Sequence, residues 1–193
     1  MKNLIQGILL LVAVTMSACG SGNGYTPVQL TGNPASTPDM TLPLSTSGFS
    51  SLGFAPSLFT GYNSTTLGFQ WTVSAWNGTQ VAAYAPMAGL VTLIETGQAN
   101  NTTNVTIYFN SRYSVKVSGL AGVNSVRMGD YVTKGQQIGL VGFAASVTAI
   151  APLKLSLFLD GNSICPFSYF DQATRSAITT QSWYSTTLGV LCQ

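Results

Sequence analysis

The 193-residue chain offers few side chains that could perform acid–base or metal chemistry. It contains no histidine, and its charged residues are seven Lys or Arg and five Asp or Glu. A catalytic zinc ion needs three nitrogen, oxygen or sulfur ligands from the protein, and histidine is the most common general base. The composition therefore argues against hydrolysis by either route.

The remaining candidates for catalysis do not form a recognisable set. Two of the carboxylates, Asp130 and Asp160, fall in predicted turns, where Asp commonly supports backbone geometry. A serine–lysine pair could be built from Lys154 and Ser156, but neighbouring positions on one strand face are more often solvated. We therefore expect no catalytic residue, no metal site and no cofactor.

The N-terminus has the pattern of a bacterial lipoprotein signal. Lys2 precedes an apolar run from Leu4 to Val14, which is too short to span a bilayer comfortably. The following Met-Ser-Ala-Cys-Gly resembles the site at which residues 1–18 are removed and Cys19 is lipidated. Gly20 is not acidic, which favours the outer membrane, with the protein anchored by lipid on the periplasmic face. An ordinary leader that happens to carry a cysteine is the alternative.

Two further cysteines are left once Cys19 is lipidated. Export to an oxidising compartment makes a disulfide between Cys165 and Cys192 the favoured arrangement, with two buried free thiols as the alternative.

Charge is scarce and unevenly placed. No Asp, Glu, Lys or Arg occurs from Met40 to Ile94, and without Lys2 the balance is six basic minus five acidic residues, or +1. Such a surface offers no footprint for nucleic acid or for anionic lipid. Either hydroxyls and amides solvate it, or much of it lies against other proteins.

The pattern along the chain predicts one mostly β domain with flexible ends. Residues 19–47 are rich in Gly, Ser, Thr and Pro and are expected to form the lipidated tether, residues 48–171 the domain, and residues 172–193 a C-terminal tail that a disulfide could tie down. Leucines alternate from Leu153 to Leu159 before an Asp-Gly turn signal. The pattern indicates an antiparallel barrel or sandwich with little helix, and Phe167 to Ala173 is the best candidate for a short helix.

Four segments of the sequence carry a family resemblance: GTQVAAYAPMAGLV (78–91), VTIYF with YSVKVSGL (105–120), VRMGDYVTKGQQIGLVG (126–142) and LKLSLFLDGNSICPFSYF (153–170). Together they resemble the LytM-type domain of the lysostaphin-like M23 metallopeptidases, whose fold is a duplicated hybrid motif. The third segment alone is not specific, because biotinyl and lipoyl domains and export-pump adaptors use the same strand–turn–strand design. Biotinyl and lipoyl domains also present a lysine for modification, and Lys134 lacks the neighbours they show.

In the third segment, glycines at 129, 135 and 139 are expected to allow sharp turns between short strands.

The resemblance also indicates where a zinc site would lie. The family's His-x-x-x-Asp pair falls near Gly68 and Thr72, its His-x-His pair on Pro152 and Lys154, and a further histidine on Gly119. Residues 61–78 contain no His, Asp, Glu or Cys, so a shift of register does not restore the first pair. An ammonium group at 154 would repel a metal cation. The resemblance therefore implies an M23 fold that has lost its reaction.

Two non-enzymatic functions fit this reading. The first is a structural or adaptor subunit that binds other envelope proteins in a large assembly, such as an outer-membrane secretion or transport complex. The second is a regulator of peptidoglycan hydrolysis that activates an amidase, or a peptidoglycan-binding module. The scarcity of charge favours the first, because a stand-alone domain would be expected to carry a charged surface. Aromatic residues that could bind sugar or peptide favour the second, although such residues are more often core: Trp71, Trp76, Tyr84, Tyr108 and Tyr113.

Overall fold

A computed structural model describes residue 30 and residues 32–44, 59–63, 68–72, 81–96, 102–141 and 152–179. The elements in these ranges are β1 (Phe59–Asn63), β2 (Gly68–Thr72), β3 (Ala82–Tyr84), β4 (Gly89–Thr96), β5 (Thr103–Tyr108), β6 (Tyr113–Gly122), β7 (Tyr131–Val132), β8 (Gln137–Val141), β9 (Pro152–Leu159), β10 (Asn162–Ile164), the 3-10 helix η3 (Phe167–Tyr169) and the α-helix α2 (Gln172–Thr179).

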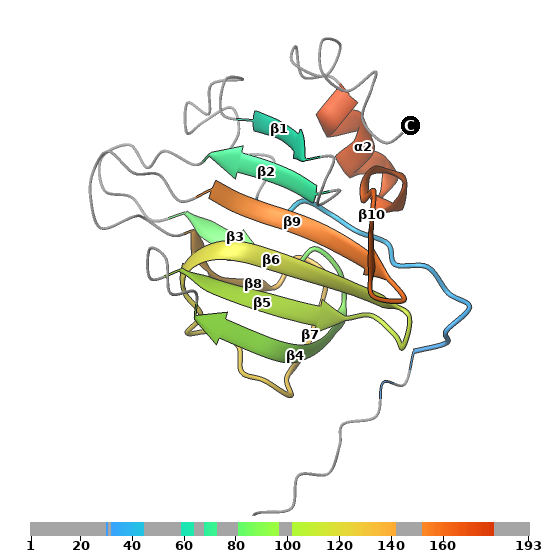
Figure 1. Cartoon of the computed structure of the whole chain (residues 1–193), viewed down its shortest axis with the longest axis horizontal. Coiled ribbons are helices and arrows are strands. Elements are labelled where there is room, and N and C mark those ends of the chain that lie inside the picture. The colour runs from blue at the N-terminus through green and yellow to red at the C-terminus, as the bar shows by residue number, and fades with distance from the viewer. Residues whose placement is uncertain are drawn as a thin grey trace, which may run out of the picture.

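The strands form one antiparallel sheet that curls on itself. Its main order is β1-β2-β9-β6-β5-β4-β7, while β10 pairs with β9 and β8 pairs with both β3 and β6. In Figure 1, β3 and β8 lie behind the row formed by β2, β9, β6 and β5. The result is a half-barrel, and the described residues include one short α-helix, so the prediction of a mostly antiparallel β fold is confirmed.

Alternation of side chains along the central strands produces the core. On β9 the side chains of Leu153, Leu155 and Leu157 are fully buried, whereas Lys154 between them is exposed. The neighbouring β6 buries Val115 and Val117 opposite Leu157 and Leu155. Because successive residues of a strand point to opposite faces, this pattern fixes an apolar inner face and a polar outer face.

The turn between β9 and β10 has the predicted chemistry. Asp160 has a φ of 51° and Gly161 a φ of 80°, the left-handed pair that a two-residue hairpin turn requires. Gly129 and Gly135 likewise have positive φ, in the turns before and after β7.

The expectation of a turn at Gly139 is wrong. This residue lies within β8, where a Cβ atom would collide with the carbonyl oxygen of Gly122 on β6. Glycine is needed there because two backbones approach closely, not because the chain turns.

The packed domain begins before the predicted boundary at residue 48. Met40, Leu42 and Leu44 are buried in the core, although they fall inside the predicted tether. Met40 forms a parallel bridge with Phe170, and its backbone N–H donates to the carbonyl of Tyr169 at 2.9 Å. Residues 40–44 are thus part of the domain.

The domain also extends past the predicted end at residue 171. Instead of a helix at 167–173, a 3-10 turn is followed by α2, which places Ile178 in the core at 3% exposure. The carboxylate of Asp171 accepts a hydrogen bond from the backbone N–H of Thr174 at 2.7 Å, which caps the start of the helix.

Several predicted features lie outside the described residues. They are the leader, Cys19, most of the tether, Trp76 and Cys192. Among the helices that the structure describes, none has the length and apolar character needed to cross a membrane.

Candidate functional site

The five positions where the resemblance places metal and proton chemistry lie on three neighbouring strands. Gly68 and Thr72 begin and end β2, Pro152 and Lys154 belong to β9, and Gly119 belongs to β6. These strands are adjacent in the order β2-β9-β6, and Thr72 pairs directly with Pro152. The sheet therefore brings all five positions into one area; their correspondence to the family's site stays a prediction.

Lys154 is at the centre of this area. It pairs across the sheet with Gln70 on β2 and with Ser118 on β6, the residue before Gly119. Its side chain is exposed on the outer face, and those of Ser118 and Ser156 are half-buried. The side chains described around Lys154 are thus hydroxyls, which are poor ligands for zinc.

Among the described residues no group of three His, Cys, Asp or Glu side chains could hold a metal ion. All five acidic residues of the sequence fall in the described ranges, so this covers every Asp and Glu side chain. The positively charged Lys154 would moreover oppose a divalent cation at the predicted position. The donor set on this part of the sheet does not fit zinc.

Four ion pairs account for most of the carboxylates. On the outer face, the ammonium of Lys116 on β6 reaches Glu95 on β4 at 3.0 Å. At one edge of the sheet, the guanidinium of Arg112 contacts Asp160 at 2.7 Å and joins the β5–β6 turn to the β9–β10 turn. This hydrogen bond and the positive charge of Arg112 lower the pKa of Asp160. Both groups are about half exposed, so the pair contributes little to stability.

A third cluster fastens the two ends of the domain together. The ammonium of Lys134 lies 2.5 Å from a carboxylate oxygen of Asp39 and 3.0 Å from one of Asp171. Burial raises the pKa of Asp171, but hydrogen bonds from Thr174 and Lys134 outweigh it and hold the pKa below its usual value. The hydrogen bond to Asp39 raises the pKa of Lys134. The sequence gives no local signal for this cluster, because Lys134 lies 95 residues from Asp39 and 37 residues from Asp171.

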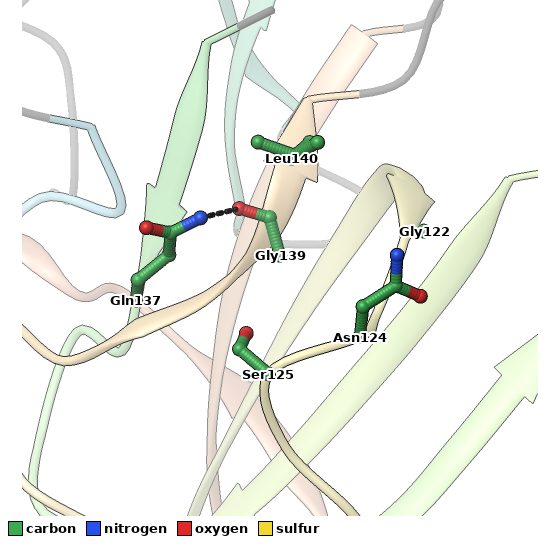
Figure 2. Close-up of a pocket in the computed structure, with 6 residues that line it drawn as sticks. All are labelled: Gly122, Asn124, Ser125, Gln137, Gly139 and Leu140. Atoms are coloured by element: carbon green, nitrogen blue, oxygen red, sulfur yellow. Dashed lines mark hydrogen bonds between the residues drawn. The ribbon is translucent and has the colours of Figure 1, made fainter.

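A small pocket lies elsewhere in the sheet, as Figure 2 shows. Its volume is about 180 Å³, and it contains neither a charged group nor any of the five predicted positions. The side-chain amide of Gln137 donates to the carbonyl of Gly139 at 3.5 Å within it. We find no arrangement there for catalysis or metal binding. The lining residues are Gly122, Asn124, Ser125, Gln137, Gly139 and Leu140.

Cys165 is disulfide-bonded, and its sulfur accepts a hydrogen bond from the backbone N–H of Phe167 at 3.5 Å. The partner cysteine lies outside the described residues, so the pairing with Cys192 stays a prediction.

Three of the five aromatic residues have described side chains, and they lie on three different strands: Tyr84 on β3, Tyr108 on β5 and Tyr113 on β6. Tyr113 is buried, and its ring packs against that of Tyr169 with 5.6 Å between the centroids. Tyr84 and Tyr108 are half-buried on β3 and β5.

Comparison with known proteins gives the class of fold. No protein-family model matches the sequence, and no curated protein matches it. Among solved structures, a Pseudomonas aeruginosa protein assigned as an M23 peptidase matches with a TM-score of 0.51 and 19% identity, over 77% of this chain and 55% of that one. Two crystal forms of Helicobacter pylori Csd3 match with TM-scores of 0.52 and 0.51 and 16% identity, over 78% of this chain and 42% and 40% of theirs.

The protein therefore has the fold of M23 peptidase structures. It spans about half the length, or less, of these three structures. At identities below 20% the likeness concerns the fold alone.

Proposed function

We propose that this protein is a non-catalytic member of the cell envelope that acts as a structural or adaptor subunit of a larger protein assembly. The support is that the positions at which the resemblance predicts the metal site carry glycine, threonine, proline and lysine, and lie on adjacent strands of the sheet. An ammonium group among hydroxyls neither binds zinc nor activates water.

The composition of the surface supports a role in assembly. Three large apolar side chains are exposed in the described part of the chain: Leu93 at 42%, Met128 at 51% and Tyr131 at 64%. Leu93 lies on β4, Tyr131 on the paired strand β7, and Met128 in the segment before β7. Exposed apolar groups on neighbouring segments of a weakly charged protein favour contact with another protein.

We also propose that a lipid on Cys19 anchors the protein to the outer membrane, on the periplasmic face. The support is the signal-like sequence around Cys19. Labelled fatty acid should be incorporated into the wild type but not into Cys19→Ser, which should leave the membrane fraction. Labelling and membrane retention of Cys19→Ser would contradict the anchor.

Gentle detergent extraction followed by native sizing tests the assembly role. We expect a stoichiometric complex several times larger than the 20.2 kDa chain, with the same partners in independent preparations. A monomer that binds purified wall sacculi, or that stimulates an amidase, would contradict this role and support a regulator of wall hydrolysis instead.

A further inference from the structure

The outer face of the sheet between β9 and β4 carries mostly polar side chains. Cross-strand pairing places residues of this face in two rows. The first row consists of Lys154 and Ser118, which pair with each other. The second row runs from Ser156 to Lys116, Thr106 and Leu93, each paired with the next. In Figure 1 no helix or strand is drawn in front of this row of strands. These two rows therefore present hydroxyls and two ammonium groups, and the second row ends at the exposed Leu93.

On this face, no carboxylate side chain of the described residues neutralises Lys154. Apart from Lys2, every charged residue of the sequence lies in the described ranges. Within those ranges the ion pairs use Arg112, Lys116 and Lys134, and no carboxylate approaches Lys154 to within 4.0 Å. Lys116, its diagonal neighbour, is already held by Glu95 at 3.0 Å.

The ammonium group of Lys154 would lose contact with water if this face is covered in an assembly. Removing an ammonium from water costs several kcal/mol unless a partner charge and hydrogen bonds replace the solvent. The described residues supply hydroxyls at Ser118 and Ser156 but no anion near Lys154. A partner that covers Lys154 must therefore bring the missing negative charge.

From this charge balance we propose that the outer face docks another envelope protein, and that a carboxylate of that protein pairs with Lys154 between Ser118 and Ser156. The proposal rests on the assembly role and specifies its surface. One unpaired ammonium group can form an ion pair with one carboxylate. The second oxygen of that carboxylate can accept a hydrogen bond from a serine hydroxyl. Anionic membranes and nucleic acids are bound by clusters of basic groups, and this face has only one cation to spare.

Zero-length coupling with a carbodiimide in the native extracted complex tests the contact directly, because it joins only an amine and a carboxylate that touch. The chain contains its own positive controls: Lys116 should couple to Glu95, and Lys134 to Asp39 or Asp171. We expect a cross-linked peptide that joins Lys154 to an Asp or Glu of a different protein. Coupling of the controls without coupling of Lys154 would overturn the proposal.

A link from Lys154 to Asp130 of a second copy would also overturn the proposed occupant. Asp130 has no side-chain cation within 4.0 Å in the described part of the chain and could serve a self-contact.

Charge reversal supplies a second measurement. Lys154→Glu should reduce the recovered complex at least tenfold, and Lys154→Gln should reduce it less. Arg175→Glu is the matched control, since Arg175 is also exposed and lies on α2 rather than on the sheet. Equal recovery of complex with Lys154→Glu and the wild type would refute the docking face while leaving the assembly role intact. Absence of any complex with the wild type would instead refute the assembly role.

Discussion

At the scale of single residues, Lys154 and Asp171 show what the sequence could and could not reveal. The exposure of Lys154 between buried leucines follows from strand alternation, which is local and readable. The second role of Asp171, as partner of Lys134, depends on a contact between residues 37 positions apart. Its role as a helix cap has a local signal, because Asp171 accepts a hydrogen bond from the backbone N–H of Thr174, only three residues later. The sequence nevertheless led us to expect that the helix begins earlier.

Removing the carboxylate of Asp171 should destabilise the domain. Asp171→Ala loses both the helix cap and the contact with Lys134, and we expect a cost of about 1–2 kcal/mol in the free energy of unfolding. Asp171→Asn keeps an acceptor for Thr174 and should cost less. Urea unfolding measures both, and equal stability of Asp171→Ala and the wild type would refute the role of the cap.

The same carboxylate should make stability depend on acid. The pKa of Asp171 is lowered from 3.8 in the folded protein, so folding favours its ionised form. Its contribution is complete above the unfolded value and is lost as the pH falls through the folded one. Below about pH 4 the wild type should therefore lose part of its advantage over Asp171→Asn, which unfolding curves at several pH values would detect.

At the scale of elements, the strands were easier to predict than the contacts between them. Alternating leucines predict β9, and Asp160-Gly161 predicts the hairpin that follows, because both signals are carried by adjacent residues. The reason for glycine at 139 was not readable, since it lies in the approach of β8 to β6 rather than in the local sequence.

Adding one methyl group at that approach should be costly. In Gly139→Ala the new Cβ meets the carbonyl oxygen of Gly122, and we expect a loss of about 1–3 kcal/mol in the free energy of unfolding. Gly122→Ala is the matched control, because a Cβ there meets only the Asn124 side-chain oxygen at 3.8 Å. Similar melting temperatures for the two variants would show that the backbones can separate without strain.

At the scale of the whole molecule, both ends of the domain were predicted incorrectly, and for one physical reason. Residues 40–44 have the composition of a tether, yet they pack against segments that lie far away in the sequence. Thr41 donates to the carbonyl of Pro86 at 2.7 Å, and Asp171 donates from its backbone to Met40 at 2.8 Å. The composition of a segment indicates how it behaves when it is isolated in water. It does not show which distant segments pack against it in the folded domain.

The buried Met40, at the start of this segment, should therefore matter for stability. Met40 is fully buried, and Met40→Ala should lower the free energy of unfolding by about 2–5 kcal/mol through lost burial and a cavity. Met128→Ala removes the same atoms from a side chain that is 51% exposed and should change stability by less than about 0.5 kcal/mol. Equal effects in thermal unfolding would mean that the segment is only loosely attached.

The central claim is that this chain keeps an M23 fold while its metal site is absent. Metal analysis of the purified full chain after dialysis against zinc, together with an assay for release of wall fragments, tests it most directly. We expect no stoichiometric zinc, no release of fragments, and the same melting temperature with and without a chelator. One zinc ion per chain, with a wall-cleaving activity that the chelator removes, would contradict the claim.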